Sequence, residues 1–169
     1  MKKSTYIKMT GFFKNNPVSK KILLLSNKIC TYIVFALYPS LLFYLLFKGR
    51  AELSSAIIVP LDGFVVLSIF RCLVNRPRPY EKFGVSSVIP KDKKGRSFPS
   101  RHVFSAFIIA FTYLSMSHIT NIFLYVGFIL LILAILIAVI RVLSGVHFIS
   151  DVIAAFVFAA VSQIISFFV

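Results

Sequence analysis

Long apolar runs alternate with short polar connections over most of this chain. Four runs have about the 20 mostly apolar residues that a helix needs to cross the hydrocarbon core of a bilayer. A fifth is nearly as apolar, but it contains Pro60 and Asp62 and runs into Arg71. The pattern therefore predicts five transmembrane helices, over residues 29–47, 53–74, 98–116, 122–140 and 148–169.

The first 28 residues have a different pattern. They scatter seven lysines among short apolar patches, and they lack the continuous apolar core of a cleaved signal peptide. Such a segment is typical of an amphipathic helix on a membrane surface, and a disordered basic tail is the alternative. We therefore expect a basic amphipathic segment, residues 1–28, followed by a membrane-embedded domain, residues 29–169.

Composition and connection lengths support a single all-α membrane bundle. The chain is 59% hydrophobic and 19 of its 169 residues are Phe, which excludes an ordinary soluble domain. Only the polar stretch 75–97 is long, and no linker separates two domains. The two cysteines, Cys30 and Cys72, lack the spacing of metal ligands, so neither a metal site nor a disulfide is expected.

The formal net charge of +14 raises the question of nucleic-acid binding. However, the cations flank hydrophobic helices, and the sequence contains no nucleic-acid-binding module. Attraction to anionic lipid headgroups accounts for lysines beside transmembrane helices. The expected partners are therefore anionic lipids and a lipid phosphate, and not nucleic acid.

Arginines stand at the end of the second predicted helix and just beyond it. Arg71 still belongs to that helix, whereas Arg78 follows Pro77, where the helix is expected to have ended. Planar guanidiniums offer paired donors that suit phosphate oxygens. We interpret Arg71 and Arg78 as phosphate ligands and Arg76 as a simple basic stop to the helix.

A second polar segment opens the third predicted helix. Ser100 and exposed backbone amides after Pro99 are typical of an anion-binding helix N-terminus. His102, in the first turn, is placed to donate a proton to a leaving oxygen. Alone, it would be read as a histidine at the membrane boundary.

A third segment joins the last two predicted helices. Asp151 follows His147 by four residues, so the two side chains share one face and the carboxylate can fix the tautomer of the imidazole. A pair that merely caps the helix is the alternative. The turn between Arg141 and His147 brings a cation beside this histidine, although an arginine here can also be a headgroup anchor.

Together these segments resemble the signature of the type-2 phosphatidic acid phosphatase superfamily, from about Pro60 to Asp151. The resemblance implies that His147 is the nucleophile, His102 the acid and Asp151 the orienting carboxylate. It also implies that the phosphate ligands are Arg71, Arg78, Ser100 and Arg141 and that no metal or cofactor is needed.

The chain departs from that signature at three positions. Arg71 stands where lysine is usual, Arg101 where glycine is common, and Ile140 where serine often precedes the arginine. Charge is kept at Arg71. The backbone amide of Arg101 can still bind phosphate, and its side chain can add a contact to a larger headgroup.

We therefore expect a metal-independent lipid phosphatase that forms a phosphohistidine. Cations beyond the need of one phosphoryl group favour a diphosphate substrate, an undecaprenyl diphosphate: Arg76, Lys82, Lys91, Lys93, Lys94, Arg96 and Arg101. These lysines could equally bind anionic lipid. The alternatives are a phosphatidylglycerol phosphate or phosphatidic acid phosphatase, a hydrolase of soluble phosphates on the same fold, and a non-catalytic headgroup-binding protein or transporter.

Two arguments disagree about the location of the site. The abundance of Lys, Ile and Phe suggests that the protein comes from an AT-rich bacterium. Its membrane would then be the bacterial cytoplasmic membrane. All Lys and Arg except Lys48 and Arg50 share one side of a five-helix topology, which by the positive-inside rule is cytoplasmic. However, several of those arginines are assigned to chemistry, and the bacterial phosphatases that the chain resembles act on the outer face. We expect an extracytoplasmic site.

Overall fold

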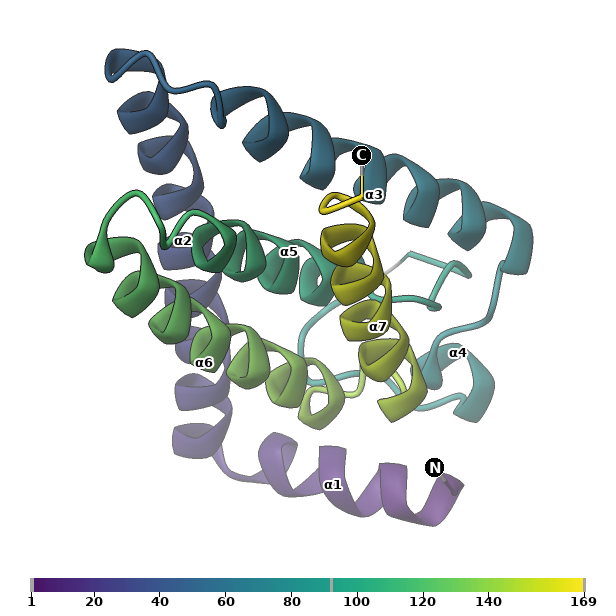
Figure 1. Ribbon diagram of the computed structural model, residues 1–169. Coiled ribbons are helices and arrows are strands. Elements are labelled where there is room, and N and C mark those ends of the chain that lie inside the picture. Colours follow the sequence, from purple (N-terminus) through teal and green to yellow (C-terminus); the bar gives the residue numbers. More distant parts are fainter. Residues whose placement is uncertain (1, 92, 169) are drawn as a thin grey trace.

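The computed structural model describes residues 2–91 and 93–168, and all regular structure in these residues is helical. Figure 1 shows one bundle in which long helices cross the molecule and a separate helix runs beneath them. The expected all-α membrane bundle is confirmed. Its helices are α1 (Lys3–Asn15), α2 (Pro17–Phe47), α3 (Leu53–Val74), α4 (Pro79–Phe83), α5 (Arg101–Ser115), α6 (Asn121–Leu143) and α7 (Ile149–Ile165).

Helix α5 forms the centre of the bundle. It packs against α2, α3, α6 and α7, and nine of its 15 residues are buried. Where α3 passes α7, Gly63 allows close contact, because a Cβ there would lie 2.7 Å from Ser162 Oγ and 2.9 Å from Phe104. The four outer helices therefore enclose α5 and expose their other faces.

Those outer faces are apolar. On α6, for example, Phe128, Ile129 and Ile132 are exposed, which is the reverse of a soluble protein. Three helices, α2, α3 and α6, are long and apolar enough to cross a membrane, and α7 is a shorter apolar helix. The chain is a multi-pass membrane protein.

The ends of the helices decide where the polar side chains lie. Helix α3 ends as expected, at Asn75 in the left-handed conformation, with φ of 39°. Helix α5 begins after Pro99, three residues later than expected, and Ser100 is its N-cap. Helix α6 extends to Leu143, three residues beyond the expected end, and Arg141 lies in its last turn.

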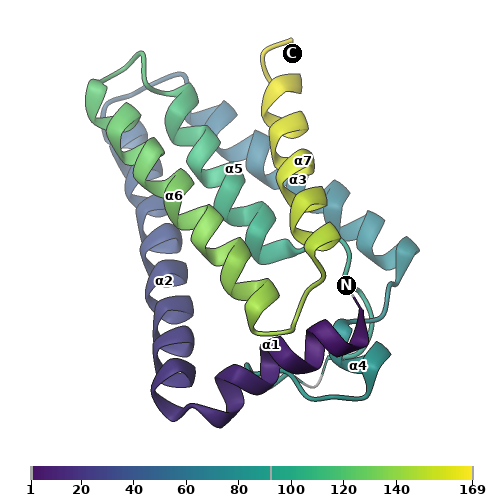
Figure 2. The same ribbon diagram turned by 90° about the horizontal axis from the view of Figure 1, so that it is seen from below.

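Helix α2 is longer than the sequence pattern suggested. It begins at Pro17, and the side chain of Asn16 caps it by accepting a hydrogen bond from Ser19 N at 3.1 Å. Lysines broke the apolar run in the sequence, but in a helix their long aliphatic stems can lie along apolar surface. Helix α1 precedes this start and crosses the end of the bundle (Figures 1 and 2).

Candidate active site

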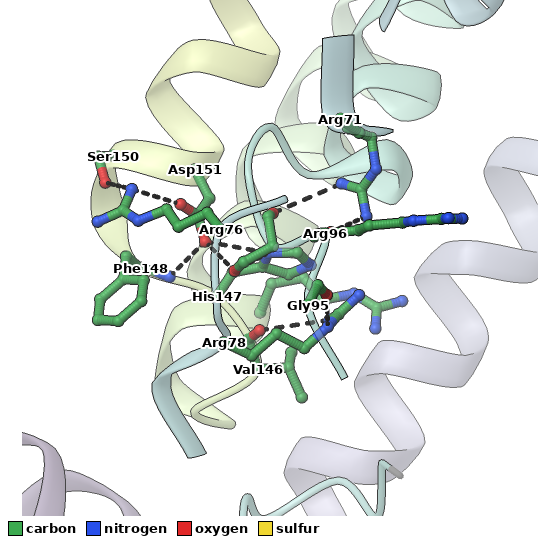
Figure 3. A network of polar contacts seen from close by, with 12 residues as sticks. Arg71, Arg76, Arg78, Gly95, Arg96, Val146, His147, Phe148, Ser150 and Asp151 are labelled. Carbon is green, nitrogen blue, oxygen red and sulfur yellow. Dashed lines mark hydrogen bonds and ion pairs between the residues drawn. The ribbon is translucent and has the colours of Figure 1, made fainter. Parts of the chain in front are cut away.

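The three polar segments meet at one end of the bundle. Helices α3 and α6 end there, and α5 and α7 begin there. Figure 3 shows side chains from α3, the connections beyond it and the start of α7 pointing toward one another. Residues far apart in the sequence therefore build one site.

Asp151 is the most heavily bonded acid of the site. It is fully buried, and its Oδ2 lies 3.3 Å from His147 Nδ1. The same oxygen accepts hydrogen bonds from Phe148 N at 2.9 Å and from Ser97 Oγ at 2.5 Å. Asp151 thus both contacts the imidazole and caps α7, so the two alternatives of the sequence interpretation hold together.

Arg76 completes the environment of Asp151. Its Nη1 lies 2.9 Å from Asp151 Oδ1 and 2.7 Å from Ser150 Oγ, and its guanidinium lies 4.5 Å from the centre of the Phe148 ring. The interpretation of Arg76 as a simple stop to the helix missed this contact. The chain reverses at Asn75, just before Arg76, and no local pattern indicates that this reversal leads to α7.

His147 is held as a neutral base. Burial lowers the pKa of His147 to about 4, which outweighs the opposing effect of the Asp151 carboxylate, and the nearby Arg78 lowers it further. Because the carboxylate accepts from Nδ1, the proton of the neutral ring belongs on Nδ1. Nε2 then carries the free lone pair.

Arg71 and Arg78 bind the segment that precedes α5. Arg71 donates to the carbonyl oxygens of Arg96 and, at 3.5 Å, Ser97. Arg78 Nε donates to Gly95 O at 3.2 Å, and its Nη1 lies 3.5 Å from Val146 O. Both guanidiniums are thereby fixed at the site with further donors to spare.

A cluster of cations surrounds an open cavity beside these arginines. The cavity has a volume of about 630 Å³. Arg71, Arg78 and Arg101 all line it, and so do three cations of the preceding segment: Lys93, Lys94 and Arg96. Such a concentration of positive charge favours an anionic ligand.

Two buried donors at the site have no partner. Among the residues that the structure describes, neither Ser100 Oγ nor Arg141 Nε forms a hydrogen bond. Ser100 N donates to Asp151 O at 3.0 Å, and the carbonyl of Arg141 accepts from His147 N at 3.3 Å. Both residues therefore lie next to the His147 and Asp151 pair, and a buried donor without an acceptor is costly unless a ligand supplies one.

His102 is exposed in the first turn of α5. It lies within electrostatic range of Arg141, His147 and Lys91. Lys91 is half-buried, and burial together with Arg141 and Arg78 lowers its pKa. In the sequence, Lys91 stands out only as one of the surplus cations. Its position makes it a further candidate ligand for an anion.

No group of three or more His, Cys, Asp or Glu side chains within residues 2–91 and 93–168 is arranged to hold a metal ion. The donors that do converge are cations, hydroxyls and imidazoles. This set suits phosphoryl transfer through nitrogen.

The comparisons with known proteins agree with this geometry. Residues 52–168 match the PAP2 superfamily. The chain belongs to this family. It is a PAP2-type membrane phosphatase, which confirms the resemblance and the expected class of enzyme, a metal-independent phosphatase.

Solved PAP2 structures show the same fold. LpxE from Aquifex aeolicus is 25% identical, and the match covers 98% of this chain and 94% of that one with a TM-score of 0.72. A transmembrane PAP2-type phosphatidylglycerolphosphate phosphatase from Bacillus subtilis is 16% identical. The match covers 96% of this chain and 82% of that one, with a TM-score of 0.71. No curated protein sequence matches the chain.

Proposed function

We propose that this PAP2 protein removes a phosphoryl group from a membrane lipid in two steps. In the first, His147 Nε2 attacks phosphorus, the bond from phosphorus to the lipid oxygen breaks, and His102 gives its proton to that oxygen. In the second, His102 takes a proton from water, the hydroxide oxygen attacks phosphorus, and the bond to His147 breaks. Inorganic phosphate leaves and both histidines return to their starting states.

The other residues of the site bind and orient. Asp151 keeps the Nδ1 proton of His147 in place and stabilises the positive charge that the ring gains on attack. The phosphoryl oxygens are bound by Arg71, Arg78, Ser100, Arg101 and Arg141.

The observation that carries this proposal is a pair of buried hydrogen-bond donors that lack an acceptor in the described part of the chain. Within residues 2–91 and 93–168, Ser100 Oγ and Arg141 Nε lie without hydrogen-bond partners, beside an imidazole whose pKa is lowered to about 4. A headgroup-binding protein would need the donors, but it has no use for a buried neutral histidine with an orienting carboxylate. The combination favours catalysis over binding.

A lipid substrate is supported by an apolar cavity beside α5, the helix that carries His102. It has a volume of about 430 Å³ and is lined by α2, α3 and α5. Among its lining residues, Ser105 and Ile109 lie three and seven positions after His102, on the same face of α5. A lipid tail lying there would present its phosphate to His102.

For the lipid itself, we propose a diphosphate such as undecaprenyl diphosphate. The cavity lined by Arg71 and Arg101 holds more cations than one phosphoryl group needs, and a second phosphate would use them. A phosphatidylglycerol phosphate is an equally supported alternative, because the Bacillus subtilis structure of similar fold carries that substrate in its name.

Release of inorganic phosphate in one micellar assay tests these proposals. Undecaprenyl diphosphate, phosphatidylglycerol phosphate and phosphatidic acid are offered in competition, with His147→Ala protein as the blank. The proposal predicts the highest kcat/KM for the diphosphate. A higher value for either glycerolipid would reject the proposed lipid and keep the mechanism, whereas turnover unaffected by His147→Ala would reject the mechanism.

We also propose that the site faces the outside of a bacterial cytoplasmic membrane. The test is labelling of a cysteine placed at Lys93 in intact cells with an impermeant reagent. The exposed Cys72 is first replaced by serine, because it lines the same cavity. Labelling that requires lysis would put the site in the cytoplasm.

A further inference from the structure

Helix α1 lies directly across the end of the bundle that carries the candidate site (Figure 2). Its inward face consists of Tyr6 and Thr10, both buried, and Phe13. Phe13 packs against a small apolar cluster made by three parts of the chain. That cluster contains Leu23 of α2, Val88 of the connection before α5, and Ile140 of α6, and Leu143 of α6 also packs against it.

The hydroxyl of Tyr6 contacts two connections at the site, the one between α4 and α5 and the one between α6 and α7. It lies 3.1 Å from Val85 O and 3.3 Å from Gly145 O. Burial raises the pKa of Tyr6 to about 12, so the hydroxyl keeps its proton and remains a donor. Tyr6 thereby contacts the turn that ends at His147, two residues beyond Gly145.

This contact is close as well as polar. Gly145 has a φ of +75°, and a Cβ at this position would lie 2.8 Å from both Tyr6 Oη and Thr10 Cγ2. In the last turn of α1, Lys14 Nζ donates to Ser86 O at 2.6 Å. Helix α1 therefore rests on the backbone of both connections and limits how far either can move.

The exposed surface of α1 carries positive charge. Lys8 lies opposite Tyr6 and Thr10, Lys3 lies in the first turn, and both are exposed; no acidic residue precedes Glu52. Ile7 and Phe12 are 44% and 60% exposed on the flanks of α1. Lysines beside exposed apolar side chains are typical of a helix lying on anionic lipid.

The start of α2 lies at the same end of the bundle as the end of α6. Leu23 clusters with Ile140, near the end of α6, and α2 begins six residues before Leu23, at Pro17. A segment beside the end of a membrane-crossing helix lies in the headgroup layer outside the hydrocarbon core. Lys20 and Lys21 lie in this part of α2, and α1 adjoins it.

We infer that α1 binds anionic lipid headgroups and that this binding holds the His147 turn in its active geometry. Tyr6 is the positioning residue that links the two. The inference rests on the proposed function, because it assigns His147 to the chemistry. It makes anionic lipid an activator of the phosphatase in addition to any role as substrate.

The test measures kcat in nanodiscs of phosphatidylcholine with an increasing share of phosphatidylserine. The substrate is a short-chain, water-soluble phosphate monoester, so that kcat at saturation is independent of enrichment at the surface. We expect kcat to rise about fivefold or more, as is usual for coupled sites. The double variant Lys3→Gln, Lys8→Gln should lose this rise.

The matched control is Lys48→Gln, Arg50→Gln, which removes two exposed cations beyond the other end of α2. It should keep the full rise, and an equal loss in both double variants would mean a general charge effect and overturn the inference. Tyr6→Phe should have a low kcat with an unchanged KM at every lipid composition. Full activation of this variant would also overturn it.

A second readout follows α1 without activity. Ser4 lies on the exposed surface of α1. A polarity-sensitive dye on Ser4→Cys, in the Cys72→Ser background, should shift to the blue with phosphatidylserine in wild-type and Tyr6→Phe protein, but not after Lys3→Gln, Lys8→Gln. An unchanged dye signal would reject the binding of α1 to lipid. Turnover that depends on His147 but ignores phosphatidylserine would reject only the coupling, whereas no turnover of any lipid phosphate would reject the proposed function itself.

Discussion

The two ends of the bundle each hold a histidine beside a carboxylate at a similar distance, and the surroundings of the two pairs differ. At one end, His118 Nε2 lies 3.2 Å from Glu52 Oε1 with side chains 61% and 28% exposed. At the other, His147 Nδ1 lies 3.3 Å from Asp151 Oδ2 with side chains 4% and 0% exposed. The distances are nearly equal, so distance alone does not make a catalytic pair. Burial and further donors to the carboxylate distinguish the second.

The largest expected effect comes from removing each histidine in turn. His147→Ala should reduce phosphate release to the level of the blank, because no other group supplies the nucleophile. His118→Ala should leave kcat/KM unchanged, since its exposed ion pair adds little even to stability. Phosphate release by the two purified variants in one assay checks this. Comparable losses in both would mean that the buried pair has no special role.

The acid of the mechanism should have the next largest effect. His102→Ala should lower kcat by about a hundredfold or more, the usual contribution of general acid catalysis. With a substrate whose leaving group needs no proton, the first step should survive, and a phosphoenzyme should accumulate. Acid-labile radioactive label on wild-type, His102→Ala and His147→Ala protein is the measurement. Label retained on His147→Ala protein would contradict the assignment of the nucleophile.

Arg76 should have a smaller effect that sharpens the comparison, because Glu52 forms no ion pair with an arginine within residues 2–91 and 93–168. Arg76→Gln should lower kcat about tenfold, as expected for the loss of a hydrogen bond to a charged group, with KM little changed. Arg76→Lys should recover part of the loss by restoring charge without the planar fork. An increase in KM with unchanged kcat would instead make Arg76 a substrate ligand.

The smallest effect concerns protonation in the native protein. The pKa of His147 is lowered to about 4, so its ring should stay neutral as the pH falls through 6.5 and gain a proton only near 4. Titration of ¹⁵N-labelled histidines by NMR in detergent, with His147→Ala protein for assignment, gives this value directly. A midpoint near the ordinary histidine value of about 6.5 would show that burial does not control the nucleophile.

The sequence was sufficient for contacts that arise within one or two turns of chain. His147 and Asp151 are four residues apart, and the start of α7 determines their geometry. In contrast, the contacts of Asp151 with Arg76 and Ser97 span 75 and 54 residues. They depend on the left-handed reversal at Asn75, and the hydropathy pattern contains no information about where such a reversal leads.

The N-terminal region illustrates the same limit. The mixture of lysines and apolar residues indicated an amphipathic segment, but it left both a helix and a disordered tail open. The contact of Tyr6 with Gly145 spans 139 residues. The residues around Tyr6 and those around Gly145 contain no local pattern that predicts it. The contact appears only once α1 is packed across the ends of the other helices.

The short length of α5 has a consequence for how the chain enters the membrane. With 15 residues this helix is about 22 Å long, less than the roughly 30 Å of a hydrocarbon core, and it begins with Arg101 and His102. We expect that the translocon does not integrate α5 alone and that it inserts as a hairpin with α6, which follows after a brief turn. Glycosylation mapping of chains that stop before or after α6 would reveal this, because only the longer chains should hold α5 across the bilayer. The membrane insertion of α5, the helix that carries His102, would then depend on α6.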